Sequence, residues 1–140
     1  MNKVIKYFRR KEKGILAYGL LLTALVFVLA SCGGGNVDPA SLRGGETRQT
    51  LAPQYFTGST ARAYVAARDV PEVLDSLHCY CECKKNFGHK SLLTCFVTTH
   101  ARNCDICINE AVMANKLHKK GYDVVAIRKA VDKAFKKYAR

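Results

Sequence analysis

Residues 103–120 read NCDICINEAVMANKLHKK, and this stretch decides the fold class. Apolar residues recur in it at spacings of three and four, which predicts a helix with one buried face. Lys119 and Lys120 suit the last turn of such a helix, and Gly121 suits the left-handed position that follows it. The buried face is expected to contain Cys104, Cys107, Ile108, Ala111, Ala114 and Leu117.

The segment that follows this helix also has helical spacing. Asp123 is placed to cap a final helix, because its side chain can accept from the first free N–H groups. The buried stripe of that helix is expected to contain Val124, Ile127, Val131, Ala134 and Tyr138.

Residues 60–77 form a third stretch with helical spacing. Pro71 interrupts it, which predicts two short helices or one kinked helix. Asp69 and Glu72 have the spacing of a capping box at the start of the second part. Further along, Ser91 suits the N-cap of a short helix over 92–97.

No window of the chain alternates for long enough to require a sheet. We therefore predict an all-α domain over residues 60–140. It should be a small bundle of about four or five short helices around a cluster of cysteine and histidine side chains.

The first 31 residues have the pattern of a secretory signal. Basic residues precede an apolar run from Ile15 to Ala30, and small residues follow it. The sequence Leu29-Ala30-Ser31-Cys32 resembles the lipobox of bacterial lipoprotein precursors. The resemblance implies cleavage before Cys32 and a lipid on its sulfur, which would anchor the protein in the cell membrane on its extracytoplasmic face. An uncleaved membrane helix with a cytoplasmic N-terminus is the alternative, and it leaves the rest of the chain outside the cytoplasm too.

Residues 32–59 are expected to be a lipidated cysteine followed by a flexible tether. Glycine, proline, serine and threonine dominate this segment, and such a composition buries too little apolar surface to offset chain entropy. The tether would hold the domain clear of the bilayer.

The chain is basic, with 23 Lys and Arg against 11 Asp and Glu. The signal holds six of these bases and one acid, which leaves 17 and ten in Cys32–Arg140. A basic surface can bind nucleic acid, but the extracytoplasmic address argues against it. We therefore expect no nucleic-acid partner.

Six cysteines remain in the domain, in two groups of three with histidines between them. A small helical domain has a modest core and usually needs an additional staple. Outside the cytoplasm, the six could form three disulfides in any of several pairings. Alternatively, thiolates and imidazoles could bind a soft metal ion, Cu(I) or zinc. The expected ligands are Cys79, Cys81, Cys83, Cys95, Cys104 and Cys107, with His89 and His100.

The spacing within each group bears on this choice without deciding it. In an extended strip, Cys79, Cys81 and Cys83 would point to one side, as a preformed ligand set would. If His100 is already helical, it would share a face with the next two cysteines. If the helix instead starts near residue 103, those two cysteines lie in its first turns, where the helix dipole lowers a thiol pKa.

A family resemblance rests on an ordered set of motifs. They are Cys79-Tyr80-Cys81-Glu82-Cys83, Gly88-His89-Lys90-Ser91-Leu92, Cys95-Phe96, His100, Cys104-Asp105-Ile106-Cys107 and Ile127-Arg128. The chain from Tyr64 to Tyr138 thereby resembles the PCYCGC-motif (lipo)proteins of bacteria. His78 stands where the motif has proline, and it offers one more imidazole. Glu82 stands where the motif has glycine, which puts a charge where the backbone would turn tightly. The resemblance implies the lipoprotein address and the Cys/His pattern, but no reaction.

Three functions are compatible with these features. The first is a membrane-anchored lipoprotein that sequesters or transfers copper or zinc. The second is a disulfide-stapled scaffold that binds another envelope protein. The third is a thiol oxidoreductase using Cys104 and Cys107, although the βαβ pattern of thioredoxins is missing from the sequence. No catalytic triad or phosphate-binding glycine loop is recognisable, so nothing in the sequence requires an enzyme.

Overall fold

The longest helix, α5 (Asp105–Lys119), forms where the spacing of apolar residues predicts it. Its buried residues include Cys107, Ile108, Ala111 and Ala114. Gly121 follows it with φ +85°, in the predicted left-handed position, and its N–H donates to the His118 carbonyl at 2.9 Å. The structure is a computed structural model that describes residues 37–139.

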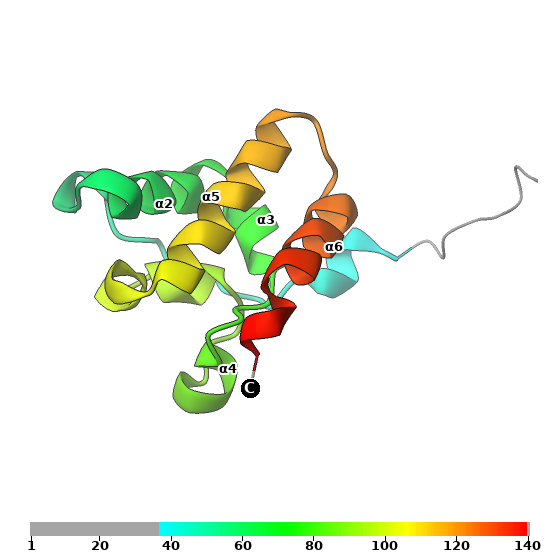
Figure 1. Cartoon of the computed structure of the whole chain (residues 1–140), viewed down its shortest axis with the longest axis horizontal. Helices are drawn as coiled ribbons and strands as arrows, with labels where there is room; N and C mark the ends of the chain where they lie inside the picture. The colour runs from blue at the N-terminus through cyan, green and yellow to red at the C-terminus, as the bar shows by residue number, and fades with distance from the viewer. Residues whose placement is uncertain (1–36, 140) are drawn as a thin grey trace, which may run out of the picture. The chain divides into compact units, whose positions relative to one another are not determined.

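Helix α5 lies between α2 (Gly58–Asp69) and α6 (Val124–Phe135) and contacts both (Figure 1). Asp123 caps α6 as predicted, because its carboxylate accepts the Ala126 N–H at 2.8 Å. Two shorter helices complete the α-helical elements of residues 37–139, namely α3 (Pro71–Asp75) and α4 (Cys83–Phe87). That part of the chain contains no strand, and the predicted all-α fold is confirmed.

In residues 37–139, short 3₁₀ helices precede α2, connect α4 with α5 and follow α6. They are η1 (Pro39–Leu42), η2 (Pro53–Tyr55), η3 (Leu93–Phe96), η4 (Thr99–Asn103) and η5 (Lys136–Tyr138).

Three local predictions are wrong. Pro71 does divide residues 58–75 into two helices, but α3 is capped by Val70 without a side-chain bond, so the capping box is missing. The Asp69 carboxylate instead accepts from the Asn115 amide and the Lys119 ammonium of α5, since both donors lie nearby on that helix.

Ser91 caps no helix, because its hydroxyl donates to the buried Asp75 carboxylate at 2.8 Å. Tyr138 is 44% exposed, because α6 ends at residue 135 and the buried stripe ends with it.

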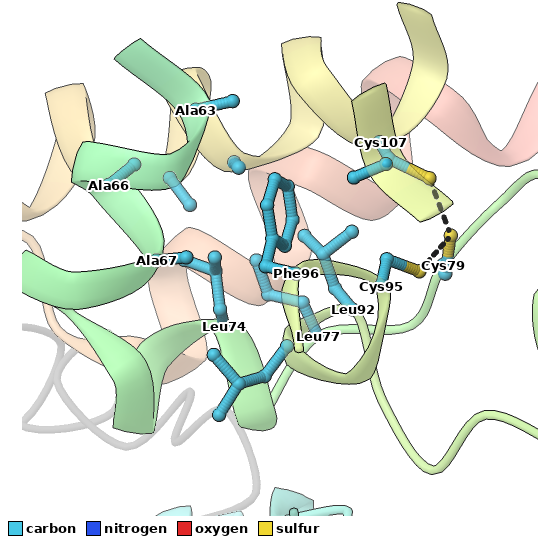
Figure 2. Packing of buried hydrophobic residues seen from close by; sticks show 14 of the residues in the cluster. Ala63, Ala66, Ala67, Leu74, Leu77, Cys79, Leu92, Cys95, Phe96 and Cys107 are labelled. Carbon is cyan, nitrogen blue, oxygen red and sulfur yellow. Dashed lines mark hydrogen bonds between the residues drawn. The ribbon is translucent and has the colours of Figure 1, made fainter. Parts of the chain in front are cut away.

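The apolar core lies where α2, α3 and α5 meet η3. Phe96 is fully buried near its centre (Figure 2), and the Tyr64 ring packs edge-on against it at 5.1 Å between centroids. At one end of this core, the side chains of Cys79, Cys95 and Cys107 continue the packing with sulfur atoms (Figure 2). The core therefore leads directly into the cysteine cluster.

The segment before α2 is bound to the domain. The N–H groups of Gly45 and Glu46 both donate to the Asp75 carboxylate at 3.0 Å, and the Leu51 N–H donates to the Phe96 carbonyl at 3.0 Å. Burial acts to raise the pKa of Asp75, but these two N–H groups, together with Ser91 and Arg43, lower it overall.

These contacts correct the expected tether over residues 32–59. Its part from Arg43 onward is held against the domain by hydrogen bonds, because the buried Asp75 carboxylate supplies acceptors that the sequence pattern does not reveal. The expected signal peptide, residues 1–31, and the expected lipidation site Cys32 lie outside the described residues. Among the helices of residues 37–139, none combines the length and the apolar character needed to cross a membrane.

Candidate metal centre

The first cysteine group lies on a turn. Glu82 has φ +64° and ψ 20°, which is left-handed backbone, and the chain reverses there before α4 begins at Cys83. The turn brings the Cys81 and Cys83 sulfurs to 2.9 Å. The predicted extended strip is therefore wrong, because the tight turn rather than side-chain alternation gathers the sulfurs of this group.

Helix α4 then positions His89, the first histidine of the cluster. The helix ends at Phe87 and is followed by Gly88, whose φ of +66° is unfavourable for residues with a side chain. The chain turns back there, and the His89 N–H donates to the Cys83 carbonyl at 3.3 Å. As a result, the His89 Nδ1 atom lies 3.2 Å from the Cys95 sulfur.

The second group comes from three consecutive elements. Cys95 lies in η3, His100 in η4, and Cys104 is the N-cap of α5, with Cys107 in its first turn. Of the two sequence alternatives, the structure has the one in which α5 starts near residue 103. His100 nevertheless joins the cluster, since its Nε2 atom lies 3.1 Å from the Cys83 sulfur.

Sulfur–sulfur contacts link the two groups. The Cys79 sulfur lies 3.4 Å from that of Cys107 and 3.6 Å from that of Cys95 (Figure 2). The Cys81 sulfur lies 3.3 Å from both Cys79 and Cys107. All six domain cysteines are free thiols in this structure.

The eight predicted site residues fall into three overlapping sets of donor atoms. Within each set, all donor atoms lie within 4.8 Å of one another. The innermost set consists of four buried thiols, whereas the other two sets include half-buried residues. The sets are Cys79, Cys83, Cys95 and Cys107; Cys83, His89, Cys95 and His100; and Cys81, Cys104 and Cys107.

These distances suit a metal ion with tetrahedral coordination. With metal–sulfur bonds of about 2.3 Å, neighbouring sulfurs of a tetrahedron lie roughly 3.8 Å apart. The contacts of Cys79 with Cys107 and Cys95, at 3.4 and 3.6 Å, need only small adjustments to reach this spacing. The donor set therefore fits a bound soft metal ion.

The thiols and imidazoles of the cluster differ in how readily they lose a proton. The hydrogen bond between Cys104 and Cys107 lowers the pKa of Cys104 and raises the pKa of Cys107. The Cys81 thiol and the N–H groups at the start of α5 lower the pKa of Cys104 further. Hydrogen bonds from Cys107 and Cys79 lower the pKa of Cys83. Burial lowers the pKa of His89, which favours the neutral imidazole that metal binding requires.

The profile of a family described as proteins of unknown function with a PCYCGC motif matches residues 49–140. The chain belongs to this PCYCGC-motif family. The comparisons of this chain with curated proteins and with solved structures found no match.

The two departures from the PCYCGC motif have different structural consequences. Glu82, at the glycine of the motif, has the positive φ that glycine adopts without strain. His78, at the proline, does not join any of the three donor sets, and its ring packs edge-on against Tyr80 at 5.0 Å. The extra imidazole is therefore not brought into the cluster.

Glu110 is a site residue that the sequence interpretation missed. It is fully buried on α5, one turn after Cys107, and its Oε1 atom accepts the Tyr80 N–H at 3.1 Å. Burial raises its pKa to about 8, against the Tyr80 N–H, which lowers it. The signal in the sequence was an acidic residue beside Ala111 and Ile108, on the apolar face of the predicted helix.

Proposed function

We propose that this protein binds a soft metal ion through its clustered thiols and imidazoles, with Cu(I) preferred and zinc second. It would sequester or transfer that ion while a lipid on Cys32 anchors it to the extracytoplasmic face of the cell membrane. The observation that carries the proposal is that all six domain cysteines, with His89 and His100, lie in sets whose donor atoms are within 4.8 Å of one another.

The donor chemistry selects the class of metal. Thiolates and imidazoles are soft or borderline ligands, and they favour Cu(I) and zinc over magnesium or calcium. Zinc prefers four tetrahedral ligands, and six sulfurs exceed that number. The softness of the thiolates is the main reason for placing Cu(I) first.

The burial of the donors supports storage or transfer rather than catalysis. A catalytic zinc site keeps one coordination position open for water or substrate. Here the innermost set already supplies four sulfurs, and none of its residues is more than 3% exposed. His89 and His100 are half-buried, so an ion can reach the cluster from their side.

The membrane anchor is supported by the sequence. The lipobox-like stretch Leu29–Cys32 follows a basic start and an apolar run. Stable anchoring of a protein by lipid requires two or more acyl chains, and a lipidated N-terminal cysteine of a lipoprotein supplies them.

The test uses two variants of the full chain, purified in detergent without exposure to air. Cys81→Ser removes the thiol at the centre of the first cysteine group, and Cys32→Ala removes a cysteine outside the domain. We expect Cys81→Ser to lower bound copper or zinc and the melting temperature, but to keep incorporation of labelled fatty acid. Cys32→Ala should do the reverse, because each variant removes only one of the two functions.

The alternatives predict other outcomes of the same measurement. A disulfide-stapled scaffold would contain no metal and no free thiols, and reductant rather than chelator would unfold it. A thiol oxidoreductase would show reversible oxidation of Cys104 and Cys107 with no metal uptake. Either result would refute metal binding, and unchanged fatty-acid labelling of Cys32→Ala would refute the anchor.

A further inference from the structure

We propose that the cluster holds at least two metal ions joined by the shared sulfurs of Cys83 and Cys95. This inference rests on the proposed function and adds to it the architecture of the site. It follows from the way in which the donor sets overlap.

Two of the donor sets have four members each and share two of them. One set contains Cys79 and Cys107 beside the shared sulfurs of Cys83 and Cys95, and the other contains His89 and His100 beside the same two sulfurs. A thiolate sulfur has several lone pairs, so it can bind two metal ions at once. Two ions bridged by two sulfurs would each then have four ligands.

The contacts between individual atoms agree with this arrangement. On the histidine side, each shared sulfur has its own imidazole, with Cys83 3.1 Å from His100 Nε2 and Cys95 3.2 Å from His89 Nδ1. On the buried side, Cys95 lies 3.6 Å from Cys79. Cys95 therefore contacts an unshared donor of each set, and Cys83, besides His100, has hydrogen bonds with Cys107 and Cys79 of the buried set.

A single ion does not use this donor set fully. The two sets together contain four sulfurs and two nitrogens, which exceeds the four ligands of a tetrahedral ion. Burial of several thiolates around one ion also leaves negative charge that water does not solvate, and a second cation reduces that cost. The unshared pairs differ in exposure as well, since Cys79 and Cys107 are buried whereas the two histidines are half-buried.

The third donor set extends the same principle. Cys81 and Cys104 are half-buried, and they share the Cys107 sulfur with the innermost set. The buried four-sulfur position thus lies between two partly exposed edges, and shared sulfurs connect it with both. An ion bound at either edge could move inward by exchanging one thiolate at a time.

The test loads the full chain, reduced and purified in detergent without air, with Cu(I) held by a competing chelator. Copper per chain is measured together with X-ray absorption at the copper edge. We expect two or more ions per chain and scattering from a neighbouring metal. One ion per chain without metal–metal scattering would overturn the shared-sulfur arrangement and leave the proposed function intact. No bound copper or zinc would overturn both.

Two variants separate shared ligation from simple hydrogen bonding. His100→Ala removes a donor found only in the histidine set, so we expect it to lose one ion per chain and the metal–metal scattering. His78→Ala removes an imidazole that lies outside all three donor sets, and it should keep both the number of ions and that scattering. Circular dichroism checks that each variant is folded. If His100→Ala binds as many ions as the parent chain, only more weakly, the histidines merely hydrogen-bond to thiolates and the proposal is wrong.

Discussion

The two ends of this domain reach their structures in different ways. At the end formed by α2, α5 and α6, helices of 12 to 15 residues bury regular apolar stripes. At the other end, residues 78–104 form a turn, a five-residue helix and two 3₁₀ helices, and they bury three of the six domain cysteines among other side chains. The first end can be stabilised by hydrophobic burial alone, whereas the second has little helical hydrogen bonding of its own. We infer that metal ligation stabilises the cluster end.

Metal removal should therefore act mainly on one end, and it is the largest effect that we predict. At a free metal concentration a thousand times the dissociation constant, binding to the folded state adds about 4 kcal/mol to the free energy of unfolding. We expect a thiol-competitive chelator to remove that amount. Hydrogen exchange should show the loss of protection first in residues 78–104, with α2 and α5 opening later.

A uniform loss of protection along residues 58–135 would contradict this difference between the two ends. The control is the same chelator on metal-free protein, where exchange should stay unchanged.

The reverse experiment weakens the apolar core where α3 packs against α2 and α5. Leu74 is fully buried in α3, on the other side of Phe96 from the sulfurs (Figure 2). We expect Leu74→Ala to lower the free energy of unfolding by about 3 kcal/mol through lost burial and the cavity that remains. Chemical denaturation measures this loss, and copper per chain in the folded variant should equal that of the parent. A folded variant that has lost its metal would show that the two ends do not act separately.

The same division governs what the sequence could predict. Apolar spacing of three and four located α2, α5 and α6, because long helices expose a periodic face that only burial explains. The caps at Asp123 and Gly121 were predictable for the same reason, since helix ends need specific partners. The all-α class followed from these elements.

The cluster end was less predictable. The eight donors could be named from residue type alone, and the structure brings all of them together. Their backbone could not be derived, because no periodic pattern records the left-handed turn at Glu82 or the reversal at Gly88. Long-range partners were also invisible: the role of Asp75 in holding residues 43–46, and that of Glu110 beneath Tyr80, depend on tertiary contacts.

Glu110 connects the two ends, and its removal should have an intermediate effect. It belongs to α5, but its carboxylate accepts the Tyr80 N–H of the cysteine turn. Glu110→Ala leaves that N–H without an acceptor, which we expect to cost about 2 kcal/mol of unfolding free energy and to weaken metal binding. Glu110→Gln keeps an acceptor oxygen of similar shape and should retain most of both. Equal losses in the two variants would show that the carboxyl group, rather than the hydrogen bond to Tyr80, is what matters.

The smallest predicted effect compares backbone conformation at the two ends. Glu82 has φ +64°, which favours glycine over residues with a side chain by about 1 kcal/mol. Glu82→Gly and Glu82→Ala both lose the glutamate side chain and its interactions, so their difference isolates the backbone. We expect the glycine variant to be more stable by that amount. Lys116 is exposed within α5, and the difference there should have the opposite sign. We expect Lys116→Ala to be more stable than Lys116→Gly by about 1 kcal/mol, because alanine favours the helical conformation. Urea denaturation of the four variants measures both differences, and alanine equal to glycine at position 82 would mean that the turn is not left-handed in solution.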